Sequence, residues 1–233
     1  YDPDRLARRW LWFTRLALPG WLAQTDPDFT FVVLASELMP QPYRDRLAAL
    51  CAAVPQVVLR FFPVIHAGTA QGQVFKELGI DYRQTLQFRL DDDDALCNLY
   101  IRRMRQAAGG IVPNAFPFAA SFRDVLFCSV GGDHAGVYQW RSPFFSAGVA
   151  LFHPSASIFG FGHYGMAERF TSISIPGHMS LVTHNGMNDT TLDEGRIRRQ
   201  KMNLIDDEAA TKAVERHFPY LTPEARAVAG LPV

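Results

Sequence analysis

The chain of 233 residues lacks several features that mark particular classes of protein. It has only three cysteines, Cys51, Cys97 and Cys128, and no CxxC pair, which argues against a disulfide framework and favours buried, reduced thiols. No apolar run approaches the roughly 20 residues that span a membrane, and no signal peptide is visible. We therefore expect a cytoplasmic protein without a transmembrane segment.

An excess of charge of one sign is also absent. The chain has 23 Lys and Arg residues against 23 Asp and Glu residues, with a pI of about 7.2. This balance argues against the basic surface of a nucleic-acid-binding protein, so no nucleic acid is expected as a partner. Short basic clusters at residues 5–9 and 196–201 are predicted to be solvated faces of helices.

The pattern of apolar residues changes along the chain. Helical and strand-like segments alternate in the first half. Helices are predicted at 5–23, 42–53 and 95–107, and a helical connection is predicted at 75–78 and 82–84. Strands are predicted at 29–35, 57–64 and 85–90, and a flexible loop at 66–72. Residues 111–182 are irregular and rich in aromatics, glycine and proline, with short strands predicted at 125–130, 136–141 and 148–152. This order predicts a single α/β domain with an irregular second half.

Four consecutive aspartates, Asp91 to Asp94, follow the apolar segment TLQFRL. Adjacent carboxylates repel one another and are costly to bury unless water or a cation neutralises them. Mg²⁺ typically takes one or two carboxylates together with substrate phosphates, so the run predicts a seat for a metal–diphosphate complex. The alternative is a solvated acidic turn that caps a helix beginning near Ala95. An EF-hand is argued against, because loop position six is not glycine and position twelve is Arg102.

The aspartates are expected to have different roles. Asp93 is the first choice for direct coordination, and Asp91 is expected on the ribose or bridged to the metal through water. Asp92 points to the opposite side of an extended backbone and is expected to face solvent. Asp94 is predicted either to coordinate the metal or to cap the following helix. Arg89 shares a face with Asp91, where it could reach a phosphate or form an ion pair.

Several blocks resemble the GT-A glycosyltransferases. Gln24-Thr25 and Asp28-Phe29 lie in a segment that looks like the opening of such enzymes after their first strand, and RLDDDDAL is similar to their RxDxDD motif. WRSPFFSAGVALF resembles the later segment that shapes the acceptor side, and HNGMNDT resembles the histidine motif that closes the metal site. In order and spacing these blocks most resemble a bacterial rhamnosyltransferase family, from about residue 5 to about residue 191.

The resemblance implies a GT-A fold with a Rossmann-like, mostly parallel sheet and an irregular acceptor-side half, in one domain over residues 1–233 whose first strand precedes Tyr1. It implies Mn²⁺ or Mg²⁺, a nucleotide diphosphate sugar donor such as deoxythymidine diphosphate rhamnose, and a glycan or other hydroxyl acceptor. The implied metal ligands are Asp91, Asp93, Asp94 and His184, and the implied donor-binding residues are Arg89, Asp91 and Asp92. Many relatives hold uracil with an aspartate at the end of the second strand, but here Ala35-Ser36 stand there, so the base stays open.

Other side chains are candidates for the acceptor side. A transferase that inverts the configuration of the sugar needs a base that deprotonates the acceptor hydroxyl. The sequence leaves open whether the reaction inverts or retains that configuration. The candidate bases are Glu168, Asp133 and Asp189, each of which is equally compatible with a surface position. Trp140, Tyr164, Phe144 and Phe145 are candidates for stacking on sugars, although core packing is the commoner role of aromatics. His178, His163 and His134 are weaker alternatives to His184.

Two other functions fit an acidic strand end. The first is a phosphotransferase of the haloacid-dehalogenase type, whose Asp-x-Asp site normally lies nearer the start of the chain. The second is a non-catalytic, Ca²⁺-dependent sugar-binding module.

Overall fold

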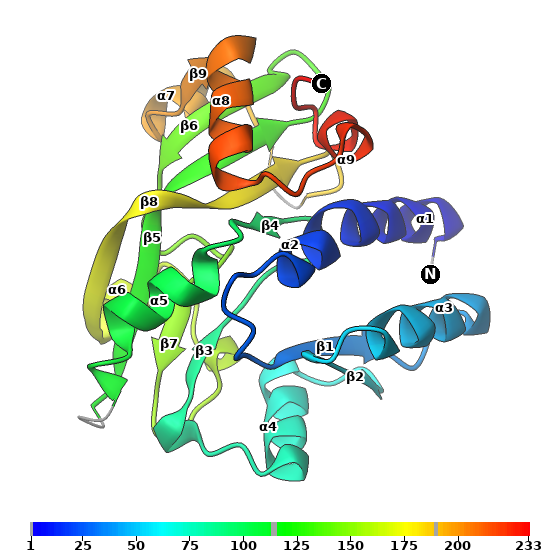
Figure 1. Cartoon of the computed structure of the whole chain (residues 1–233), viewed down its shortest axis with the longest axis vertical. Helices are drawn as coiled ribbons and strands as arrows, with labels where there is room; N and C mark the ends of the chain where they lie inside the picture. The colour runs from blue at the N-terminus through cyan, green and yellow to red at the C-terminus, as the bar shows by residue number, and fades with distance from the viewer. Residues whose placement is uncertain (1, 113–115, 189–190) are drawn as a thin grey trace.

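A long helical segment begins the chain in the computed structural model, which describes residues 2–112, 116–188 and 191–233 (Figure 1). Helix α1 (Pro3–Trp12), a π-helical turn (Phe13–Ala17) and α2 (Leu18–Leu22) follow one another without a break, which confirms the predicted helix. The Asp2 carboxylate caps α1 by accepting hydrogen bonds from the backbone N–H groups of Asp4 and Arg5, at 2.9 and 3.3 Å.

A small parallel sheet follows, formed by β1 (Phe31–Ser36) and β2 (Val57–Phe62) and connected through α3 (Gln41–Ala52). The helical segment α1–α2 and helix α3 cover one face of this sheet, in a cluster that contains Phe13, Leu18, Trp21, Leu47, Cys51, Phe31, Val33 and Leu59. Helix α4 (Ala67–Leu78) lies on the opposite side (Figure 1). These strands and α3 agree with the predicted alternation.

The predicted loop at residues 66–72 is wrong, because α4 begins at Ala67. His66 caps this helix through Nδ1, which accepts from the Gly68 N–H at 3.1 Å. Val74 and Phe75, on the inner face of the helix, are buried. Their burial stabilises the helix despite the glycines in its first half, which are unfavourable in a helix on propensity alone.

Within the described residues, the larger sheet has seven strands in the order β3-β7-β5-β6-β9, with β8 paired to both β5 and β4. The strands are β3 (Leu86–Phe88), β4 (Ala95–Leu96), β5 (Phe118–Ser129), β6 (Gly136–Arg141), β7 (Ala150–Phe152), β8 (Thr171–His184) and β9 (Asn203–Ile205). β5 and β8 run parallel, whereas the other pairs described in this sheet are antiparallel. The architecture is therefore α/β as predicted, but a mostly parallel sheet is not confirmed.

The remaining helices are α5 (Tyr100–Ala108), α6 (Met166–Arg169), α7 (Glu194–Arg199), α8 (Asp207–His217) and α9 (Pro223–Val228). The helix predicted from residue 95 begins at Tyr100 instead, because Ala95 and Leu96 pair with Leu181 and Ser180 of β8. All three cysteines are buried and free, as expected. Among the helices that the structure describes, none combines the length and apolarity needed to cross a lipid bilayer.

The two sheets do not join edge to edge in the described residues. β1 pairs only with β2, and β3 pairs only with β7. A groove of about 560 Å³ lies between β1 and β3, lined by Phe29–Val32 and Leu34 on one side and by Thr85–Leu90 on the other. The edges of two strands thus face each other without sharing hydrogen bonds.

Candidate active site

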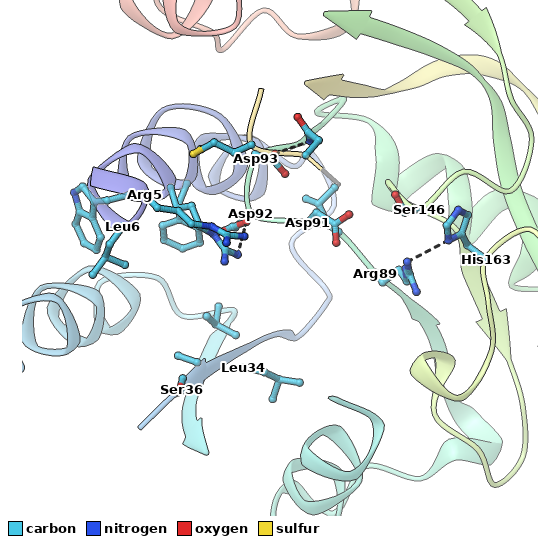
Figure 2. Close-up of a pocket in the computed structure, with 18 of the residues that line it drawn as sticks. Arg5, Leu6, Leu34, Ser36, Arg89, Asp91, Asp92, Asp93, Ser146 and His163 are labelled. Atoms are coloured by element: carbon cyan, nitrogen blue, oxygen red, sulfur yellow. Dashed lines mark hydrogen bonds and ion pairs between the residues drawn. The ribbon is translucent and has the colours of Figure 1, made fainter. Parts of the chain in front are cut away.

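A pocket of about 1500 Å³ lies between the N-terminal helix, the end of β1, the acidic turn and α7. Figure 2 shows part of its lining. Its lining is polar on several sides, with Asp91, Asp92 and Asp93 from the turn, Arg5 and Arg9 from α1, Arg196 and Arg199 from α7, Arg89 from the segment that follows β3, and His163 from the segment that precedes α6. The residues at the end of β1, Leu34, Ala35 and Ser36, also line it. Three aspartates of the acidic run and the end of β1 therefore meet in one cavity.

The acidic run does not continue the strand. Strand β3 ends at Phe88, two residues before the run begins. The chain then turns at Asp92-Asp93, so the aspartate side chains point in different directions (Figure 2). Asp91 is the exposed member of the run. Asp92 was expected to face solvent, but it forms a bidentate ion pair with Arg9 of α1, with both N···O distances at 2.8 Å. The expectation for Asp92 assumed an extended backbone, and the turn removes that assumption.

Asp93 is held by amide groups from the segment that follows β8. Its Oδ2 accepts from Nδ2 of Asn185 at 3.1 Å and from Nδ2 of Asn188 at 3.4 Å. Its backbone carbonyl accepts from the Thr183 hydroxyl at 2.8 Å. Burial, with the neighbouring Asp92 and Asp91 charges adding to it, raises the pKa of Asp93 to about 6. Asp93 is therefore a partly buried carboxylate in the pocket lining, and a nearby cation would stabilise its charged form.

Asp94 is almost fully buried and accepts from the backbone N–H of Thr183 at 3.1 Å. Burial holds its pKa well above the ordinary value, and the charges of Asp93 and Asp91 act in the same direction. The predicted helix cap at Asp94 is wrong, because strand β4 follows it. Asp94 is not among the residues that line the pocket, and it fastens the turn to β8 instead.

Arg89 and His163 form a second polar pair in the pocket. Nη2 of Arg89 lies 3.3 Å from Nδ1 of His163, and the Arg89 Nε is buried without a hydrogen-bond partner among the described residues. Burial and the Arg89 charge lower the pKa of His163. Neutral His163 accepts from Arg89 through Nδ1 and carries its proton on Nε2, where it is a donor. The sequence ranked this histidine below His184.

His184 lies at the end of β8 and is not among the pocket-lining residues. Its ring stacks on Phe127 with the centroids 6.1 Å apart. His178 stands beside His217 on the far part of β8, at 5.5 Å, and His134 lies in the turn between β5 and β6. The structure therefore does not bring the predicted metal-site histidine to the pocket.

The other predicted acceptor-side residues separate into two groups. Tyr164 and Phe145 line the pocket, with their rings 6.3 Å apart. Trp140 and Phe144 are buried in the core, so their predicted stacking on sugars is wrong. The two described candidate bases, Glu168 and Asp133, are exposed and do not line the pocket, whereas Asp189 lies outside the described residues.

The Gln24-Thr25 pair, singled out by resemblance, has a local structural role. The Gln24 side chain donates to the carbonyls of Gly20 and Cys97, at 2.8 and 2.9 Å, and its oxygen accepts from the Ile101 N–H at 3.0 Å. Thr25 N–H donates to the Asn98 carbonyl at 2.9 Å. These hydrogen bonds join the end of α2 to the start of α5 and so fix the position of α2 relative to α5.

Among the described residues, no cluster of three or more His, Cys, Asp or Glu side chains converges in a way that would enclose a metal ion. The predicted set of Asp91, Asp93, Asp94 and His184 therefore does not form a closed cage. Asp91 and Asp93 alone among these four line the pocket. The carboxylate oxygens of Asp91 and Asp93 would therefore coordinate a metal ion incompletely, and a bound ligand would have to supply further coordinating atoms.

The sequence matches a family of transferases. The sequence model described as "Putative rhamnosyl transferase" matches residues 1–197, most of the chain, and the match spans nearly all of the pocket lining. The chain belongs to this family. It is thus a glycosyltransferase by family, as the sequence blocks indicated. The comparison with curated proteins finds no match.

Proposed function

We propose that this rhamnosyl transferase family member binds a nucleotide diphosphate sugar in the large pocket, together with Mn²⁺ or Mg²⁺, and transfers the sugar to a hydroxyl group. The observation that carries the proposal is the meeting of Asp91 and Asp93 with four arginines of α1 and α7 around one cavity of about 1500 Å³. Carboxylates on one side and guanidinium groups on the other suit a cation and a diphosphate bound side by side.

The open carboxylate set fits such a metal. Mg²⁺ is commonly held by one or two carboxylates together with substrate phosphates, and not by a closed protein cage. Asp91 and Asp93 would hold the ion, which when bound would neutralise negative charge on the leaving diphosphate. The raised pKa of Asp93 supports this role, because a partly buried carboxylate without a cationic partner gains most from a cation.

The side chains around the carboxylates can bind and orient the donor. Arg5 of α1 and Arg199 of α7 are exposed in the lining, where they can reach phosphate oxygens. Arg89 has a buried Nε without a hydrogen-bond partner among the described residues and is positioned to donate to the donor. His163 offers an Nε2 donor beside Tyr164 and Phe145, which form the aromatic side of the pocket.

We expect the end of β1 to bind the donor base without a carboxylate. Ala35 and Ser36 line the pocket there, and neither carries an acidic group that would accept from the N3–H group, which uracil and thymine share. Deoxythymidine diphosphate rhamnose is the donor that family membership suggests. We expect deoxythymidine and uridine diphosphates to bind with affinities within about tenfold of each other, which titration calorimetry with Mn²⁺ measures. An exclusive preference for the uridine compound would overturn this reasoning.

We further propose that the fold is of the GT-A type, completed by one strand in the groove between β1 and β3. The connection β1–α3–β2 joins parallel strands, and such crossovers are right-handed in about 98% of cases. The segment α1–α2 covers the same sheet face as α3. A strand leading into α1 would therefore lie on the side of β1 away from β2, which is where the groove is.

The direction of the N-terminal helix supports this placement. Asp2 and Arg5, at the start of α1, line the same pocket as Ala35 and Ser36 at the end of β1. The helix therefore runs back along the strand, as the crossover helix of a βαβ unit does. A strand that ends near Asp2 would run parallel to β1 and join the two sheets.

Ligand-dependent stability tests the proposed activity. A nucleoside diphosphate with Mn²⁺ at about 100 times its Kd should stabilise the protein by about 2.7 kcal/mol, and a sugar nucleotide panel should then identify a donor that is hydrolysed only with metal. Protection by a free sugar with Ca²⁺ alone would support the sugar-binding module instead. Release of phosphate from small phosphoesters would support the phosphotransferase. Either of these results, without nucleotide binding, would overturn the proposal.

A further inference from the structure

The segment after β8 turns back on itself so that two asparagine side chains point at the acidic turn. Gly186 adopts a φ of 79°, a conformation that glycine reaches without strain, and it lets the chain reverse directly after Asn185. The side-chain oxygen of Asn188 accepts from the Asn185 N–H at 2.8 Å, and that of Asn185 accepts from the Met187 N–H at 3.1 Å. Both amide oxygens are thus used within the turn.

This use of the oxygens fixes the orientation of both amides. An asparagine whose oxygen accepts a local backbone N–H must direct its NH₂ group the other way. Both Nδ2 atoms then reach the same atom, Oδ2 of Asp93, at 3.1 Å from Asn185 and 3.4 Å from Asn188. Nδ2 of Asn188 is also 3.3 Å from the Thr183 carbonyl, and the Thr183 hydroxyl holds the Asp93 carbonyl.

One oxygen of the Asp93 carboxylate is therefore fixed by two donors. The side-chain donors described around Asp93 reach Oδ2 and not Oδ1. Amides are neutral, so they orient the carboxylate and leave its charge uncompensated. An arginine or lysine in their place would pair with that charge and compete with any cation.

We propose that Asn185 and Asn188 are positioning residues that hold Asp93 through Oδ2 and direct Oδ1 to the ligand in the pocket. This inference rests on the proposed function, because it assumes that Asp93 is a ligand-binding group. It assigns the contact with the acidic turn to the two asparagines of the HNGMN segment. The histidine of that segment packs its ring on Phe127.

The first test asks whether the contact exists in solution. A double-mutant cycle with Asn185→Ala and Asp93→Ala measures the coupling in urea unfolding of the metal-free protein. We expect the coupling to change the folding equilibrium constant about tenfold, as a hydrogen bond to a charged group does. Asn203→Ala, at an exposed position on β9, is the matched control and should not couple to Asp93→Ala.

The second test asks whether the contact positions Asp93 for a ligand. Deoxythymidine diphosphate with Mn²⁺ is titrated calorimetrically into wild type, Asn185→Ala, Asn188→Ala and the double variant, each checked by circular dichroism. We expect Kd per folded molecule to rise about tenfold in Asn185→Ala and further in the double variant, with no change in Asn203→Ala. A merely structural role would lower stability and leave these affinities unchanged.

The outcomes separate the inference from the proposed function. Absent coupling, or coupling with unchanged affinity in the variants, overturns the positioning role while wild-type binding still supports the proposed function. If the wild type binds neither deoxythymidine nor uridine diphosphate with Mn²⁺, the proposed function fails, and the positioning role fails with it even where coupling is measured. Coupling together with weakened binding supports both.

Discussion

Replacing Asp93 by asparagine should stabilise the metal-free protein while removing ligand binding. The charged carboxylate is partly buried and lies beside two further aspartates, so burial and repulsion raise its pKa from 3.8 to about 6. Asparagine keeps an oxygen that can accept from the Asn185 and Asn188 amides, but it carries no charge. The substitution thus removes the cost of the charge and retains the hydrogen bonds.

The size of this effect follows from the pKa shift. A shift of about two pH units at 1.36 kcal/mol each gives an upper value of about 3 kcal/mol, and partial exposure to solvent lowers our expectation to about 2 kcal/mol. For a chain of this length that corresponds to a rise in Tm of about 4–8 °C. Because the folded protein holds its proton more tightly than the unfolded chain, wild-type stability should fall as pH rises from about 4 to 6.

The assay is thermal unfolding of wild type and Asp93→Asn at pH 4 and pH 8, with EDTA present. The gain in Tm should be fully present at pH 8 and largely lost at pH 4, where the carboxyl group is protonated in the folded protein and about half protonated in the unfolded chain. Asp91→Asn is the control, because Asp91 is exposed and its substitution should change stability far less. A lower Tm for Asp93→Asn at pH 8, or an equal gain at both pH values, would refute the reasoning.

Three further predictions concern other parts of the pocket and the groove. Arg9→Gln should lower the free energy of unfolding in urea by less than 1 kcal/mol, because its pair with Asp92 is exposed by 49% and 35% at the two side chains; a larger loss would contradict this. His184→Ala should lower Tm through loss of the contact with Phe127 and leave calorimetric Mn²⁺–nucleotide affinity unchanged, whereas weakened affinity would return His184 to the site. A six-residue Val/Ile/Thr strand fused ahead of Tyr1 should raise Tm and protect amides of β1 and β3 from hydrogen exchange, while the same extension with prolines should not; equal protection by both would exclude the proposed strand.

The first half of the fold was predictable because its signals are local. The apolar stripe of residues 5–23 and the runs at β1 and β2 specify helix and strand through their own periodicity. The predicted helix start at residue 95 was wrong because Ala95 and Leu96 pair with β8, some 85 residues later in the chain. The first half of α4 was missed because its glycines weaken the local helix signal, and the burial of Val74 and Phe75 outweighs that weakness.

The candidate site shows the same division. The acidic run was expected at a ligand site, and Asp91, Asp92 and Asp93 line the pocket together with the end of β1. The separate roles of the four aspartates were not predictable, since a turn at Asp92-Asp93 sends neighbouring side chains to Arg9, to the pocket and to β8. Asn185 and Asn188 stood inside a segment noted for its histidine, and nothing in their residue types marked them as partners of Asp93.

By itself the sequence determined the α/β class, the family and the acidic centre of the pocket, because these depend on composition, periodicity and short contiguous motifs. Only the tertiary structure decided which carboxylate is exposed, which is paired and which is buried. It also decided that Asn185 and Asn188 donate to Asp93, while the His184 ring stacks on Phe127. The reason is physical: a side chain's charge state and partners are set by desolvation and by groups brought within about 3 Å, and those groups come from segments some 90 residues apart.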